Sequence, residues 1–137
     1  MQVEVMTTAG LGDKSYVFGH EGVGIIVDPQ RDIERCTAAI EKLSVTPRFV
    51  FETHMHNDYL SGGATLAETV DAELVLPAGA GAAYAYRPAF HGEELDAGPM
   101  RIRPVHTPGH TPEHVSYLVL IDDEPVAVFS GGSLLVG

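Results

Sequence analysis

The hydrophobic period changes along this chain, and that change limits what it can fold into. Residues 3–6, 16–18 and 23–27 are short runs rich in β-branched and aromatic side chains, and glycines lie between or beside them. Residues 28–43 instead repeat apolar side chains at a spacing of three to four, with charged side chains on the other face. This pattern predicts an antiparallel meander followed by an amphipathic helix that begins just after Pro29.

The remaining residues continue the mixture of strands and helices. We expect strands at 48–52, 73–76, 100–105, 115–121 and 126–129, and helices at 64–70 and 78–85. We find no internal repeat and no linker long enough to split the chain. The sequence therefore predicts a single α/β (α+β) layered domain over residues 1–137.

The charge balance argues against several kinds of partner. The 137 residues include 8 Lys and Arg against 19 Asp and Glu, a formal net charge of −11. Such a chain lacks the basic stripe that neutralises nucleic-acid phosphates or anionic lipid headgroups, so we expect neither nucleic acid nor a membrane as partner. The first residues do not form a signal peptide, and no run approaches the roughly 18 apolar residues that span a bilayer. We therefore expect a cytoplasmic protein.

Histidine, not cysteine, is the residue type that points to chemistry. The single cysteine, Cys36, excludes an internal disulfide and a cysteine-based zinc knuckle, and it falls at an apolar helix position where we expect it to be buried. Seven histidines are present, and neutral imidazole is the commonest metal ligand in proteins.

The first histidine cluster is Thr-His-Met-His-Asn-Asp-Tyr at 53–59, directly after an apolar strand. Positions two apart in an extended segment point the same way, so His54, His56 and Asp58 can converge. Two imidazoles and a carboxylate suit Zn(II), Fe(II) or Mn(II). His-x-His alone is common, however, and a polar surface loop is the competing interpretation.

The second cluster is His-Thr-Pro-Gly-His-Thr-Pro-Glu-His at 106–114, which also follows a predicted strand. The two prolines restrict φ and the glycine widens the choice of conformation, so we expect His110 to be held in a defined turn as a metal ligand. We expect His106 and His114 to face solvent.

Taken together, the two clusters resemble motifs of the metallo-β-lactamase fold superfamily, in particular its glyoxalase II and persulfide dioxygenase (sulfur dioxygenase) branch. The resemblance rests on Thr-His-x-His-x-Asp, on Gly62-Gly63 and on His-Thr-Pro-Gly-His-Thr-Pro, and it extends from Asp28 through Phe129. It implies the N-terminal half of a four-layer αββα sandwich. It also implies a metal at the sheet edges held by His54, His56 and His110, with Asp58 as a base or as a ligand to a second metal.

Three departures from the family pattern bear on the chemistry. Tyr59 stands where the motif His-x-His-x-Asp-His ends in histidine, and Gly132 stands where the family has a metal-binding aspartate. The chain also resembles only the first of the two similar halves of the superfamily domain. The resemblance therefore implies a mononuclear site with one divalent ion, Fe(II) or Zn(II). Asn57-Asp58-Tyr59 and Ser130 to Leu135 also resemble metallo-hydrolase domains that are fused to rhodanese modules.

Two classes of function stay open at this point. One is a metal-dependent enzyme, a thioester hydrolase or a sulfur dioxygenase, acting on a small thiol-derived substrate such as a thioester or persulfide. The other is a non-catalytic, incomplete half-domain. A half-sandwich leaves one sheet face uncovered, so we expect a homodimer or a complementary C-terminal half as partner.

Overall fold

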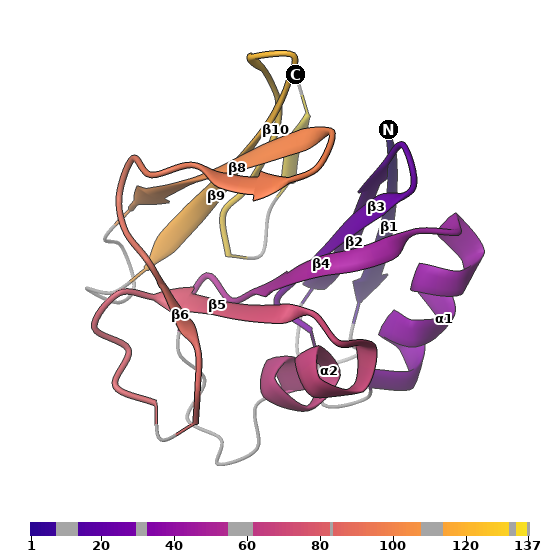
Figure 1. Ribbon diagram of the computed structural model, residues 1–137, viewed down its shortest axis with the longest axis horizontal. Coiled ribbons are helices and arrows are strands. Elements are labelled where there is room, and N and C mark those ends of the chain that lie inside the picture. Colours follow the sequence, from indigo (N-terminus) through magenta and orange to yellow (C-terminus); the bar gives the residue numbers. More distant parts are fainter. Residues whose placement is uncertain are drawn as a thin grey trace.

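The computed structural model describes residues 1–7, 14–29, 33–54, 62–82, 84–107, 114–131 and 134–136. Two sheets and two helices make up this part of the chain (Figure 1). The six-stranded sheet has the order β1 (Gln2–Thr7), β2 (Lys14–His20), β3 (Val23–Val27), β4 (Thr46–Phe51), β5 (Glu73–Pro77), β6 (Arg87–Ala89). The five-stranded sheet has the order β11 (Leu134–Val136), β10 (Glu124–Phe129), β9 (Val115–Ile121), β8 (Met100–His106), β7 (Leu95–Ala97).

Strand direction decides which chain segments meet at one edge. The first three strands pair antiparallel, as the sequence predicted, and β3, β4, β5 and β6 pair parallel. Parallel neighbours need crossovers, which helix α1 (Ile33–Leu43) provides between β3 and β4 and helix α2 (Gly62–Val70) provides between β4 and β5. The carboxyl ends of β3 and β4 therefore lie at the same edge.

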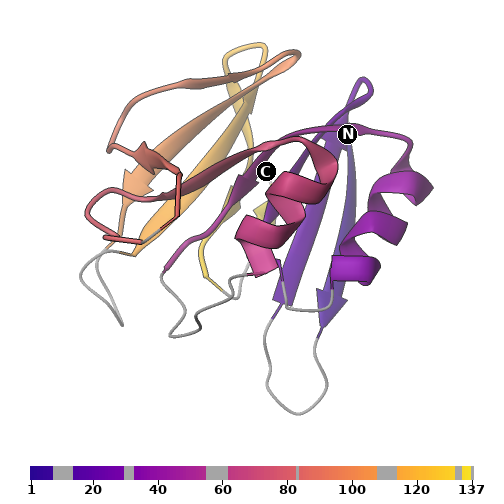
Figure 2. The same cartoon turned by 60° about the horizontal axis from the view of Figure 1, so that its bottom comes forward.

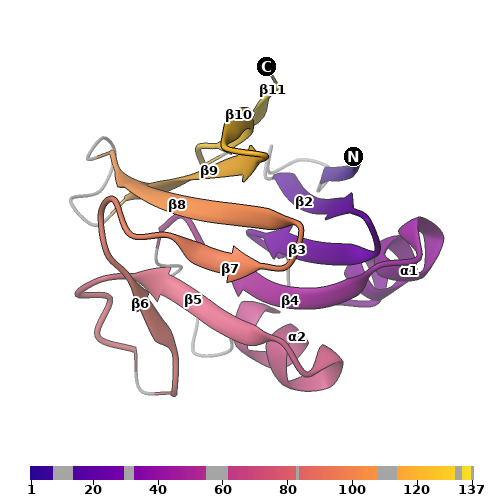
Figure 3. The ribbon, with the colours of Figure 1, turned by 45° about the horizontal axis from the view of Figure 1, so that its top comes forward.

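The elements stack in three layers: helices, six-stranded sheet and five-stranded sheet (Figures 2 and 3). Alternate residues of β2 separate the two cores, since Phe18 packs between the sheets and Val17 packs under the helices. Tyr117 and Phe129 face Phe18 and Phe51 from the other sheet. The layers confirm the predicted fold class.

Helix α1 forms for the reason its period suggested. Cys36, Ala39 and Ile40 recur at a spacing of three to four and are buried against the sheet. Cys36 is 1% exposed, which confirms that this thiol is a core residue. Of the two helices, both within the described residues, neither is long and apolar enough to cross a membrane.

The predicted helix at 78–85 is wrong, because its described residues are not helical. Gly79 and Gly81 adopt φ of 84° and 70°, left-handed values that no right-handed helix contains. Instead the Ala78 N–H donates to the carbonyl of Ala89, at the end of β6. The short strands β6 and β7 were not predicted, because three residues are too few to show a period.

Candidate metal centre

The structure describes only one of the four predicted site residues, His54. His56, Asp58 and His110 lie outside the described residues, as do Tyr59 and Gly132. Their roles stay predictions. The surroundings of His54, in contrast, can be followed residue by residue from the end of β4.

A buried carboxylate lies beneath the segment that carries His54. Asp28 follows β3 directly, is 5% exposed and has a φ of 51°. Its two carboxylate oxygens accept hydrogen bonds from Thr53, one from the backbone N–H at 2.8 Å and one from Oγ1 at 2.7 Å. Because β3 and β4 are parallel neighbours, their carboxyl ends bring this pair together. The buried charge thereby gains two hydrogen bonds.

The same threonine fixes the chemistry of the His54 ring. Thr53 Oγ1 lies 2.9 Å from His54 Nδ1, and a hydroxyl has one proton, which it donates to Asp28. The contact with the ring therefore requires a proton on Nδ1, and this proton count assigns the tautomer. In neutral His54 the lone pair is then on Nε2. A carboxylate or hydroxyl that holds one ring nitrogen while the other binds a metal is the usual support of a histidine ligand.

Two hydrogen bonds tie this segment to the other sheet. The Val115 N–H donates to the Thr53 carbonyl at 2.8 Å, and the Tyr117 hydroxyl donates to the Glu52 carbonyl at 2.6 Å. Burial, followed by the negative charges of Asp28 and Glu52, raises the pKa of Tyr117 well above its ordinary value of 10.0. Tyr117 thus stays a protonated donor over the physiological range.

His114 was expected to face solvent, and that expectation is wrong. It is half-buried, and its ring stacks on that of His54 with centroids 5.9 Å apart and planes 11° apart. Thr107 Oγ1 lies 2.9 Å from His114 Nδ1 and also 2.9 Å from Ser116 Oγ. The Thr107 N–H donates to the His114 carbonyl, so the two ends of the second histidine cluster pair with each other. His106 is exposed, as predicted.

Gly131 closes the site from the end of β10. A Cβ at this position would overlap His114 Nε2 and would lie 3.3 Å from Thr53 Oγ1. Gly131 also has a positive φ of 35°. The carboxyl ends of β3, β4, β8 and β10 and the start of β9 therefore converge on one small region.

Similar proteins point to one superfamily. No protein-family model matches the sequence. A hydroxyacylglutathione hydrolase-like protein of Bos taurus is 40% identical over 93 residues, which are 66% of this chain and 47% of the relative. A metallo-β-lactamase structure from Staphylococcus aureus superposes with a TM-score of 0.82 at 26% identity, over 95% of this chain and 42% of that one. The structure of ETHE1 from Myxococcus xanthus gives a TM-score of 0.77 at 28% identity, over 87% and 54%.

The chain has the metallo-β-lactamase fold. Its closeness to hydroxyacylglutathione hydrolases (glyoxalase II) and to ETHE1 confirms the branch that the histidine motifs resembled. The chain spans about half the length of these relatives.

One predicted metal ligand, His54, lies within the described residues, and its ring is oriented. Among them no group of three or more His, Cys, Asp or Glu side chains is placed to hold a metal ion. His54 fits such an ion, since its Nδ1 is held by Thr53 and its Nε2 carries the lone pair. The other predicted ligands, His56 and His110, lie outside the described residues.

Sequence reasoning missed Asp28, Thr53, His114 and Gly131 as parts of this site. One signal was available for Asp28, a carboxylate directly after an apolar strand at the same kind of strand end as Thr53. No comparable signal marks Gly131, because its role depends on a contact with a residue on another strand.

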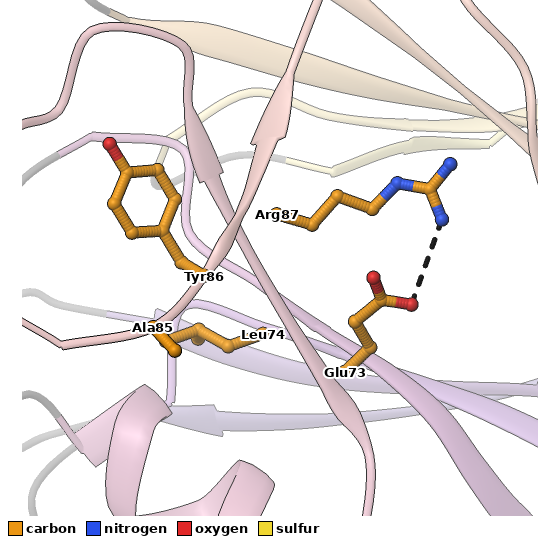
Figure 4. A pocket seen from close by; sticks show the side chains of 5 residues that line it. All are labelled: Glu73, Leu74, Ala85, Tyr86 and Arg87. Carbon is orange, nitrogen blue, oxygen red and sulfur yellow. Dashed lines mark ion pairs between the residues drawn. The ribbon is translucent and has the colours of Figure 1, made fainter.

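A pocket lies at the opposite end of the parallel strands (Figure 4). It measures about 450 Å³ and is lined by Glu73, Leu74, Ala85, Tyr86 and Arg87. Glu73 and Arg87 begin β5 and β6 and form an ion pair at 3.6 Å, so the pocket opens at the amino ends of these strands. Tyr84 and Tyr86 pack against the core beneath the helices.

Proposed function

We propose that this chain carries the metal-binding edge of a metal-dependent thioester hydrolase. The observation that carries the proposal is the series Asp28–Thr53–His54, in which a buried carboxylate orients one imidazole at a strand end. The comparison supports the substrate class, since the similar bovine protein is named for hydrolysis of a glutathione thioester.

The proposed ligands are His54, His56 and His110, holding one divalent ion. Three imidazoles leave coordination positions open, as catalytic metal sites do. A divalent ion such as Zn(II) would act there as a Lewis acid on the thioester carbonyl and would lower the pKa of water. We assign Asp58 the task of orienting the attacking water or accepting its proton. Thr53 and Asp28 hold His54 in the tautomer that presents Nε2.

A sulfur dioxygenase acting on a persulfide with Fe(II) is the second candidate. The resemblance of the histidine motifs to the persulfide dioxygenase branch favours it, and histidine ligands with open positions also suit non-haem iron. The resemblance to metallo-hydrolase domains that are fused to rhodanese modules is consistent with a substrate of this sulfur class. The two candidates differ in the metal they require.

Metal content and turnover test both candidates. The chain is purified anaerobically without a histidine tag, and Fe, Zn and Mn are measured per mole of protein. We expect near-stoichiometric zinc and release of free thiol from a hydroxyacyl glutathione thioester, with both lost in His54→Ala and retained in His106→Ala. Near-stoichiometric iron, together with oxygen uptake in the presence of glutathione persulfide, would show that the chain is a dioxygenase and not a hydrolase. Absence of metal would overturn both for this chain and favour the incomplete half-domain.

The outer face of the five-stranded sheet supports a further layer. Leu118 alternates with the core residues Tyr117 and Val119, is half-buried and points away from the inter-sheet core, whereas both described helices lie on the six-stranded sheet (Figure 2). We propose that a complementary C-terminal half, of the kind that extends the relatives beyond the matched region, covers this face. A monomer in sedimentation at micromolar concentration that binds an apolar dye supports this. A stable homodimer would show that a second copy covers the face instead.

The cytoplasm is the compartment we propose for this protein, from its composition. Fractionation of the source cells tests the location, and recovery in a membrane or secreted fraction would contradict it.

A further inference from the structure

We infer that His114 is a positioning residue that fixes the ring plane of His54. The inference concerns the proposed metal site, but only its zinc-affinity test depends on the proposed function. The hydrogen bond with Thr53 places one atom of the His54 ring, Nδ1, and constrains the position of that atom more than the plane of the ring. The His114 ring lies parallel to the His54 ring and constrains that plane.

Two contacts place the His114 ring. Its Nδ1 is engaged by Thr107, and its Nε2 lies against the backbone of Gly131, where no side chain would fit. The planes of the two imidazoles differ by only 11° and their centroids are 5.9 Å apart, so the rings lie parallel and offset and do not meet edge to face.

The backbone places the two rings together independently of any ligand. Val115, next to His114, donates its N–H to the carbonyl of Thr53, next to His54. Thr107 donates its N–H to the carbonyl of His114 itself. A direct backbone hydrogen bond therefore joins the two segments that carry His54 and His114, although these segments belong to different sheets. Absence of a side chain at Gly131 then allows the His114 ring to lie over His54.

Ring dynamics measured by NMR test the inference without metal. In the chain labelled with ¹³C-histidine, order parameters are measured for the ring C–H bonds of His54. We expect a rigid ring in the unsubstituted protein, a clear loss of order in His114→Ala and an intermediate value in Thr107→Val, which keeps the ring but removes its hydrogen bond. His106→Ala, which removes an exposed histidine next to Thr107, serves as the matched control and leaves His54 rigid.

Zinc affinity gives the second readout, by competition with a chromophoric chelator. We expect His114→Ala to raise the dissociation constant roughly tenfold, as loss of a residue that orients a ligand does. Urea unfolding of each variant separates this effect from loss of the fold. Unchanged order of His54 in a folded His114→Ala overturns the inference, since a merely structural role lowers stability alone. If the unsubstituted chain binds no zinc, the proposed function fails while the ring dynamics still decide the role of His114.

Discussion

Two histidines of this molecule, His54 and His114, each contact a threonine hydroxyl, but the groups that these threonines contact in turn are different. His54 and His114 each have Nδ1 within 2.9 Å of a threonine hydroxyl, on Thr53 and Thr107. Behind Thr53 is the buried carboxylate of Asp28, and behind Thr107 is the neutral hydroxyl of Ser116. A carboxylate can only accept hydrogen bonds, so Thr53 must donate to Asp28 and His54 Nδ1 must donate to Thr53. A serine hydroxyl can donate or accept, so Ser116 imposes no such direction on Thr107 and His114.

The comparison shows that the group behind the threonine decides what each ring can do. The carboxylate behind Thr53 assigns the lone pair of His54 to Nε2, which suits a metal ligand. The hydroxyl pair behind His114 assigns no tautomer, and Gly131 packs against its Nε2. The difference could not be predicted from the two His-containing motifs, because Asp28 is far from both in sequence and reaches Thr53 only through strand pairing.

Removal of the Asp28 carboxylate abolishes the difference between the supports of His54 and His114, and it has the largest expected effect on stability. In Asp28→Ala the buried N–H and hydroxyl of Thr53 lose their acceptors, so we expect the free energy of unfolding to fall by about 2–4 kcal/mol, measured in urea. Asp71→Ala is the matched control, since Asp71 is exposed with a similar φ of 57°. An equal loss in the two variants would reduce Asp28 to a turn residue. In Asp28→Asn, which keeps the shape, we expect weaker zinc binding by roughly tenfold or more.

A methyl group at Gly131 displaces the His114 ring. Gly131→Ala combines an unfavourable φ with overlap on the His114 ring, and we expect a loss of roughly 1–3 kcal/mol in urea unfolding. Gly22→Ala isolates the backbone term, because Gly22 also has a positive φ but a Cβ there meets nothing within 4 Å. The histidine ring signals of His54 and His114 should shift only in Gly131→Ala. Shifts of the same size in both variants would contradict the contact.

Removal of the Tyr117 hydroxyl, which joins β9 to the segment that carries His54, has a smaller expected effect on stability. Tyr117→Phe removes the hydrogen bond from β9 to the Glu52 carbonyl, and we expect a loss of about 1 kcal/mol at neutral pH. Because the pKa of Tyr117 is raised in the folded state, its contribution is fully present below pH 10.0 and is lost as pH rises beyond that value. Stability of the unsubstituted protein should therefore fall more steeply above pH 10 than that of Tyr117→Phe. Parallel pH profiles would exclude this role.

The sequence predicted most of the fold because its long elements carry a clear period. The repeat that buries Cys36 and Ile40 appears directly in the residues, as does the alternation of buried and more exposed residues in β8. The segment at 78–85 was mispredicted, since its alanines favour a helix locally while Gly79 and Gly81 take left-handed conformations. Strands β6 and β7 form through pairing with β5 and β8, which no local pattern of three residues reveals.

The candidate site could be predicted only where its residues are adjacent in sequence. His54 was found from a motif that places histidines after a strand. His114 was assigned to solvent because the expectation considered its own turn, whereas its neighbours are His54 and Gly131 on other strands. Asp28 and Thr53 meet through a parallel pair, and such a contact becomes visible only when the sheet order is known.

The most direct test of the account is the ring-nitrogen NMR spectrum of His54 in the ¹⁵N-histidine-labelled chain at pH 8, recorded before and after addition of zinc. The hydrogen bonds from Asp28 through Thr53 predict a neutral ring protonated at Nδ1, with the large zinc-induced shift on Nε2. A ring protonated at Nε2, or a zinc-induced shift on Nδ1, would contradict the claim that the buried carboxylate prepares His54 as a metal ligand.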